Sequence, residues 1–237
     1  MDGLLSVNCV QFGIIFLAAL VHASLQCELG ALLLLYHASL GKHIKIKTKF
    51  LVSNYILGSA LLICLIVSTI CFLIATLTNG SLSTLCLAVL ASVLLMLALL
   101  IWFFYYKSKR STELWLPKSI ARHINKRAKL TESNVEAFSL GMLTAFAEMP
   151  FSFVLMLIAG NSVVLLPFEL QIVGIAIYTF VAVLPLFILR FFIRRGSTVV
   201  DVQKWRVKNK NFLKVLSGTL FLTLAIFIIA FRIMGAQ

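Results

Sequence analysis

Two short segments of this sequence place a hydroxyl residue, a glutamate and a helix-breaking residue at matching positions within apolar surroundings. Residues 23–30 read ASLQCELG, and residues 143–150 read LTAFAEMP. A shift of about 120 residues superposes three pairs, which are Ser24 with Thr144, Glu28 with Glu148, and Gly30 with Pro150. Side chains four residues apart lie on one face of a helix, so each hydroxyl is expected to stand beside its glutamate.

The chemistry of these glutamates depends on their surroundings. A charged side chain at the centre of a bilayer costs at least about 2.5–3.5 kcal/mol, so each glutamate is expected to face a cavity, hold a cation or be protonated. Burial favours the neutral form of a carboxyl group, which would let each one exchange a proton for another cation. We therefore expect Glu28, Glu148, Ser24 and Thr144 to form a substrate or ion site. The alternative is that each glutamate is a protonated carboxyl group that bonds a neighbouring helix for structure alone.

The elements that must position these residues are transmembrane helices. The chain has 237 residues, of which 61% are hydrophobic and 12% charged, and its mean hydropathy is +1.05, so no water-soluble fold could bury its apolar surface. A helix needs roughly 20 apolar residues to cross the hydrocarbon core. Six stretches qualify, at about residues 8–41, 50–77, 83–106, 134–165, 169–193 and 212–234. We expect an all-α polytopic membrane protein with six transmembrane helices in a single domain, residues 1–237.

The basic residues alternate between connections. The first, third and fifth connections carry four, eight and eight Lys or Arg residues, whereas the second and fourth carry none. The positive-inside rule predicts that the basic loops are cytoplasmic and that both termini are extracytoplasmic, in a plasma (inner) membrane. We therefore expect the basic residues behind the net charge of +13 to set the membrane topology and to contact anionic lipid headgroups. We expect no nucleic-acid partner.

Six helices divide into two halves, residues 1–106 and residues 134–237, joined by a basic cytoplasmic linker, residues 107–133. Two similar halves with three helices each must be inverted relative to one another. The first and fourth apolar stretches exceed the length of a straight crossing, and each contains a helix breaker, Gly30 or Pro150. We expect both helices to be broken, with helix tilt as the alternative explanation of their length.

The linker contains a short amphipathic segment. Leu116, Ile120 and Ile124 fall on one helical face, and Pro117 is favourable in a first turn. This spacing predicts a short helix that lies on the cytoplasmic interface.

Other polar residues in the apolar stretches give weaker signals. His22 and Gln26 share a face that is turned away from Glu28, so we do not expect a preformed His/Gln/Glu metal cluster on this helix. Asn54, Gly58 and Ser59 give the second helix a small, polar face that is suited to close packing. Tyr178 is expected to play a comparable packing role in the fifth helix.

All five cysteines lie in the first half, at or within the membrane. Free cysteine is a common small apolar filler, which is the role that we expect. A thiol redox pair or a soft-metal site would instead use Cys27 with Cys64 or Cys71. The sequence contains no CxxC, Walker, GxSxG or HExxH motif, so we expect neither an enzyme nor a bound cofactor.

Residues 137–160, AFSLGMLTAFAEMPFSFVLMLIAG, resemble the fourth-helix region of the lysine-exporter superfamily. This group of three-plus-three inverted-repeat proteins includes the cytochrome c biogenesis thiol carriers and cation/proton exchangers, and CELG is similar to the glutamate-x-glycine segment of the exchangers. The resemblance implies a secondary transporter in which Glu28 and Glu148 coordinate the substrate or accept protons. The exchangers follow their glycine with an aspartate and a basic residue, where this chain has Ala31 and Leu32. The thiol carriers use a cysteine in each half, whereas the second half of this chain has none.

We therefore expect a secondary transporter that exports a cation or small cationic solute by alternating access, coupled to protons or ions. One alternative is a transmembrane thiol-disulfide electron carrier that uses Cys27, and another is a noncatalytic membrane subunit or assembly factor. The expected partners are the lipid bilayer, the transported solute and anionic lipid headgroups at the cytoplasmic loops, and a homo-oligomer is left open.

Overall fold

The computed structural model describes residues 2–25, 45–78, 80–105, 118–194, 204–205 and 208–234, and the regular structure within them is helical. The helices are α1 (Asp2–Ser24), α3 (Lys45–Leu77), α4 (Thr84–Leu100) with the π-helix η1 (Ile101–Tyr105), α5 (Lys118–Leu130), α6 (Asn134–Val164), α7 (Phe168–Arg194), and α9 (Lys210–Ile228) with the π-helix η2 (Ile229–Met234). Six of them, all but α5, contain a segment long and apolar enough to cross a membrane. The predicted all-α, multi-pass architecture is confirmed.

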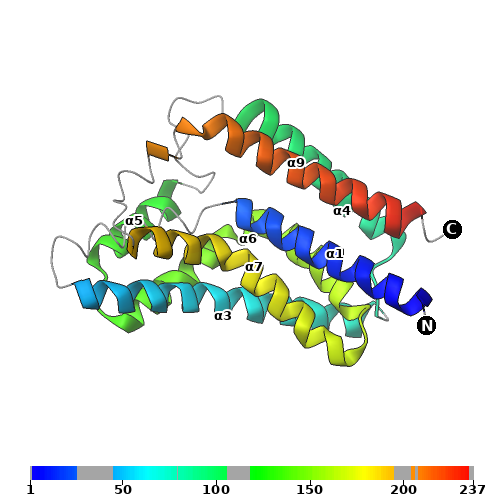
Figure 1. The fold of residues 1–237 in the computed structure, drawn as a ribbon, viewed down its shortest axis with the longest axis horizontal. Helices are drawn as coiled ribbons and strands as arrows, with labels where there is room; N and C mark the ends of the chain where they lie inside the picture. The colour runs from blue at the N-terminus through cyan, green and yellow to red at the C-terminus, as the bar shows by residue number, and fades with distance from the viewer. Residues whose placement is uncertain are drawn as a thin grey trace.

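The six long helices run along one common direction (Figure 1). α1, α3, α6 and α7 pack together, while α4 and α9 lie side by side along one side of the bundle. α1 contacts α6, α7 and α9 and so joins the two groups. The two chain termini lie at the same end of the bundle, and α3 and α6 begin at the opposite end.

The contact between α3 and α6 depends on small residues. A Cβ atom at Gly58 would collide with the main-chain carbonyl oxygen of Phe138, and a Cβ atom at Gly141 would collide with that of Tyr55. The Ser59 hydroxyl donates a hydrogen bond of 3.1 Å to the Gly141 carbonyl. The two helix backbones can therefore approach closely only because both contact positions are glycine, which confirms the packing role predicted for Gly58 and Ser59.

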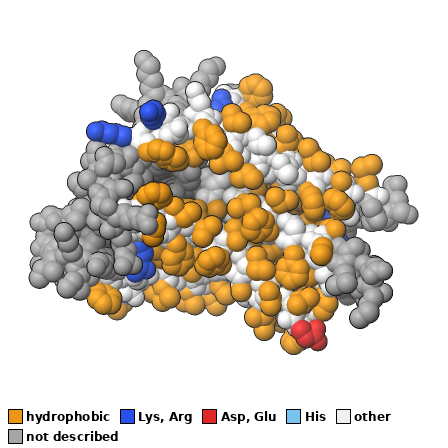
Figure 2. All heavy atoms as spheres, viewed as in Figure 1, with side chains coloured by type: hydrophobic (Ala, Val, Ile, Leu, Met, Phe, Trp, Pro, Cys, Tyr) orange, Lys and Arg blue, Asp and Glu red, His pale blue; other side chains and the backbone are white. Residues whose placement is uncertain are grey.

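The outward surface of the bundle is apolar, as contact with lipid requires. Figure 2 shows hydrophobic side chains over most of the visible face. Large apolar residues are exposed on every long helix, for example Phe16, Phe72, Met96, Phe146, Phe180 and Ile226. Exposure of one such side chain to water instead of hydrocarbon would cost on the order of 1–2 kcal/mol.

The predicted linker helix is present as α5, residues Lys118–Leu130. Ile124 and Ala128 are buried and lie one helical turn apart, and α5 packs on α6. Leu116 lies outside the described residues. The placement of this helix at the membrane interface stays a prediction.

Candidate functional site

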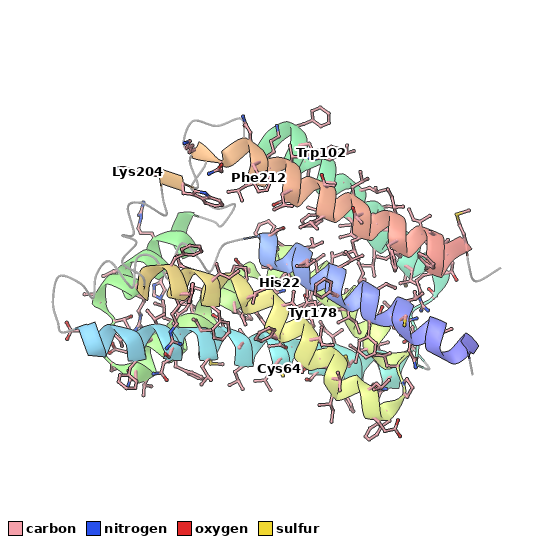
Figure 3. All side chains as sticks on the ribbon, viewed as in Figure 1. His22, Cys64, Trp102, Tyr178, Lys204 and Phe212 are labelled. Atoms are coloured by element: carbon pink, nitrogen blue, oxygen red, sulfur yellow. The ribbon has the colours of Figure 1, made fainter. Side chains whose placement is uncertain are left out.

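Three buried polar side chains from three helices meet inside the bundle. The His22 imidazole on α1 lies between the other two, with Nδ1 at 3.0 Å from the Tyr178 hydroxyl of α7 and Nε2 at 3.8 Å from Oε2 of Glu148 on α6. His22 and Glu148 are 4% and 3% exposed, and Tyr178 is fully buried. Figure 3 shows the labelled His22 and Tyr178 side by side in the view. We call these three residues the central polar cluster.

The helices place the cluster near the middle of the bundle. Glu148 lies near the midpoint of α6, which spans Asn134–Val164, and Tyr178 lies in the central part of α7. His22 lies in the last turn of α1. α1 therefore ends beside the middle of α6, at a depth where a carboxyl group and an imidazole are expensive to bury unless they are functional or well paired.

The end of α1 has local causes in the sequence. The Leu25 amide donates to the His22 carbonyl at 3.0 Å, a tight turn that replaces the helical hydrogen-bond pattern. The Ser24 hydroxyl donates to the Val21 carbonyl at 2.7 Å. Ser24 therefore satisfies a carbonyl group of its own helix end.

A second pair of polar residues lies one helical turn from Glu148. The hydroxyl groups of Tyr55 on α3 and Thr144 on α6 are 2.7 Å apart, and both residues are buried. Thr144 and Glu148 both face the interior, as their spacing of four residues predicts. Thr144 Oγ1 also lies 2.9 Å from the Gly141 carbonyl, so this hydroxyl can bond its own helix as well as Tyr55.

Some of the predicted site residues belong to the segment that follows α1. Cys27, Glu28 and Gly30 lie outside the described residues, so the proposed pairing of Glu28 with Glu148 stays a prediction. Glu28 follows the end of α1 by four residues in the sequence.

The predicted break of the fourth helix at Pro150 is wrong. α6 continues through Pro150 from Asn134 to Val164. Pro150 and Phe146 are both exposed on the outer side of the helix, so the missing N–H group faces away from the packed interior. A proline removes one main-chain hydrogen bond, and the remaining ladder and the packing against α3 are enough to keep the helix continuous.

Excess length also fails as a sign of a broken helix. α3 has 33 residues, more than a straight crossing needs, and is continuous. α6 has 31 residues and is continuous as well. In the first apolar stretch, predicted over residues 8–41, α1 ends at Ser24, so a helix end is present within this stretch. Gly30, the predicted position of the break, lies outside the described residues.

The cysteines that the structure describes are free thiols. Cys71 is buried, with Sγ at 3.7 Å from the Gly160 carbonyl, and Cys64 is half-buried. These two residues lie seven positions apart on the straight helix α3, or roughly 10 Å along its axis, which is too far for a disulfide bond. Their packing matches the expected role of apolar filler.

The residues that the structure describes contain no group of three or more His, Cys, Asp or Glu side chains that could hold a metal ion. The central polar cluster offers one imidazole and one carboxyl group, with a phenol behind the imidazole. These groups can accept, donate and pass protons.

The sequence singles out Glu148 and Thr144, which the structure places in the buried interior, but it does not reveal the contact of His22 with Glu148. His22 was considered only against Glu28 and Gln26 of its own segment, whereas its partners come from α6 and α7. The available signal was the presence of an ionisable histidine within an apolar helix, which by itself marks a functional candidate in a membrane. Tyr178 was expected only to pack, and it also orients His22.

The chain matches no family model, no curated protein and no solved structure.

Proposed function

We propose that the protein is a proton-coupled secondary transporter of a cation or small cationic solute, in which His22 and Glu148 form the proton-binding pair. The observation that carries this proposal is the 3.8 Å approach of an imidazole nitrogen to a carboxyl oxygen in the buried centre of a membrane bundle. An imidazole and a carboxyl group at this separation can pass a proton between them. A cation that competes with the proton for the carboxylate would then be exchanged for it.

Tyr178 sets the orientation of the imidazole. When its hydroxyl donates to Nδ1 of His22, the ring proton of the neutral imidazole lies on Nε2, which faces Glu148. The separation of 3.8 Å exceeds a direct hydrogen bond, so a small closing movement between α1 and α6 would bring the proton into transfer distance. Such a movement would couple protonation to the relative position of the two helices.

The helix arrangement supports two inverted halves. An inverted repeat would exchange α1 with α6, α3 with α7 and α4 with α9. Under this exchange the contact between α3 and α6 corresponds to the contact between α7 and α1, and both contacts are present. The same exchange keeps the α4–α9 pair together. The third helix of each half also continues into a π-helix, η1 or η2.

Two buried tyrosines strengthen this correspondence. Tyr55 on α3 bonds Thr144 on α6, and Tyr178 on α7 bonds His22 on α1. Each tyrosine thus joins the second helix of one half to the first helix of the other. The match is approximate in register, because Ser24 rather than His22 is the sequence counterpart of Thr144.

The lysine-exporter resemblance adds Glu28 to this proposal as the second acidic residue of the site. Alternating access would then expose the residues near the end of α1 and the middle of α6 to each side of the membrane in turn. The end of α1 beside Glu148 supports this role, because helix ends at mid-depth offer main-chain carbonyl groups that can coordinate a cation.

The test uses the full chain in proteoliposomes with an entrapped pH dye. A panel of monovalent cations, divalent cations and cationic amino acids is added outside, and proton movement is recorded. We expect at least one cation to drive proton movement, and Glu148→Gln to abolish it while Glu169→Gln, at an exposed position of α7, leaves it unchanged. If no cation moves protons with the unmodified chain, the carrier proposal fails and a noncatalytic subunit is favoured.

We also propose that the basic loops are cytoplasmic and both termini extracytoplasmic. The two termini lie at one end of the bundle. The start of α3, the end of α7 and the start of α9, which border basic connections, lie toward the other end (Figure 1). A reporter that is active only in the cytoplasm, fused to either terminus, is expected to be silent. An active reporter at both termini would invert the proposed orientation.

A further inference from the structure

A cavity of about 570 Å³ opens between α5 and the first three turns of α6. Its lining residues are His123, Arg127, Leu130, Thr131, Val135, Glu136, Ser139, Leu140 and Leu143. None of the central polar cluster residues contributes to this lining. The cavity therefore requires its own explanation.

The wall from α5 is cationic. His123 and Arg127 lie four residues apart on one face of this helix, and both side chains are exposed. α5 as a whole contains five Lys or Arg residues and no acidic residue. An anionic group that entered the cavity would meet a guanidinium group in a strongly basic setting.

The wall from α6 is largely aliphatic and continues into the membrane. Val135, Leu140 and Leu143 are its aliphatic members, and the small Ser139 lies one turn from both Val135 and Leu143. Leu143 lies nine residues into α6, which corresponds to roughly 13 Å along the helix axis. The cavity thus has a basic wall on α5 and a mainly aliphatic wall on α6, and the second wall reaches as far as Leu143.

The acidic residue in the lining, Glu136, does not neutralise the basic wall on α5. Glu136 Oε2 accepts hydrogen bonds from the main-chain amides of Glu132 at 2.8 Å and Ser133 at 3.3 Å, and it completes the capping box at the start of α6. Its carboxylate is therefore committed to the helix N-terminus, although it also attracts Arg127. The helix terminus is already capped, so the Arg127 guanidinium group and a ring N–H group of His123 are the donors that remain for an external anion.

We propose that this cavity binds one anionic phospholipid. The phosphate would lie at Arg127 and His123, and the first part of an acyl chain would lie against Leu130, Val135 and Leu143. A phospholipid offers a phosphate group and acyl chains to one site, and the basic wall and the aliphatic wall of this cavity supply a matching surface for each. A free phosphate ion would use only the cationic end. This inference does not depend on the proposed transport function.

The test measures binding of dioctanoyl phosphatidylglycerol to the full chain in detergent, with dioctanoyl phosphatidylcholine and inorganic phosphate as separate arms. Arg127→Gln is expected to weaken phosphatidylglycerol binding about tenfold, the factor that one charge-assisted hydrogen bond provides. Arg122→Gln removes the same charge from an exposed α5 position outside the cavity lining and should leave the affinity unchanged. Ser139→Phe keeps every charge but fills the cavity, and it should also reduce binding.

Equal binding of the two lipids would overturn the proposal, as would equal losses in Arg127→Gln and Arg122→Gln. Competition by inorganic phosphate at the same concentration as the lipid would show an ion site instead and would equally refute it. Retention of full affinity by Ser139→Phe would show that the lipid binds elsewhere. Thermal unfolding of each variant separates these outcomes from loss of folding.

Discussion

The Tyr178 hydroxyl lies 3.0 Å from Nδ1 of His22, across the contact between α7 and α1. The two residues are 156 positions apart in the chain and both are buried. This contact leaves Nε2 of His22 directed at Glu148 on a third helix. The position of one proton on the imidazole therefore depends on side chains from two other helices, α6 and α7.

Removal of the Tyr178 hydroxyl should change function more than stability. Tyr178→Phe keeps the buried ring and loses one hydrogen bond, so the free energy of unfolding should fall by about 0.5–1.5 kcal/mol. The pH dependence of proton movement in proteoliposomes should shift, because the imidazole is no longer held in one orientation.

Tyr55→Phe is the matched control for this change. It also removes a buried tyrosine hydroxyl, here the one that bonds Thr144 at 2.7 Å. A similar loss of stability with an unchanged pH profile is expected. Identical pH profiles for Tyr178→Phe and the unmodified chain would show that Tyr178 has only a packing role.

Gly141→Ala should destabilise the bundle strongly. Its Cβ atom would collide with the Tyr55 carbonyl oxygen, so α3 and α6 would have to separate. We expect a loss of about 1–3 kcal/mol, as for other overpacked cores, measured by unfolding in mixed detergent micelles. Gly13→Ala serves as the control, because its Cβ atom would meet the Phe227 side chain at an ordinary 3.5 Å. Equal stability of the two variants would contradict the close packing of α3 and α6.

Pro150→Ala should preserve transport, because α6 is continuous through this position. The new N–H group can donate to the Phe146 carbonyl, so the unfolding midpoint should stay the same or rise. Transport is measured in the proteoliposomes described for Glu148→Gln, and the unfolding midpoint is measured in mixed detergent micelles. A folded Pro150→Ala variant without transport would instead indicate that the helix must open at this residue during the cycle.

Cys64 and Cys71 should not take part in a redox cycle. The double variant Cys64→Ala/Cys71→Ala is expected to retain proton movement, and the buried Cys71 thiol should react with maleimide much more slowly than the exposed Cys86 thiol. A disulfide bond between Cys27 and either α3 cysteine in the oxidised protein would contradict this expectation and would revive the thiol-carrier alternative.

The helices were predictable from the sequence because each is a long apolar run bounded by polar connections. The six spans and the short helix α5 follow from this pattern, and α5 was also marked by its amphipathic spacing. The helix end at Ser24 and the continuity of α6 at Pro150 were not predictable in the same way. Both depend on local hydrogen bonds and packing that apolar composition does not record.

The candidate site was predictable only in part. Glu148 stood out because a carboxyl group in an apolar helix is costly wherever it points. Its contact with His22 was missed because lipid and protein interior are equally apolar, so the hydrophobic pattern does not reveal which helix faces meet. The polar contacts between His22, Tyr178 and Glu148 could be assigned only once the helices had been placed together.

The most direct test of the central claim is a double-mutant cycle on proton movement with His22→Gln, Glu148→Gln and the combined variant. If the two residues bind one proton as a unit, each single substitution abolishes cation-driven proton movement and the combined variant is no worse than either. Proton movement at the unmodified rate in folded Glu148→Gln, or independent and additive losses in the two single variants, would contradict the account.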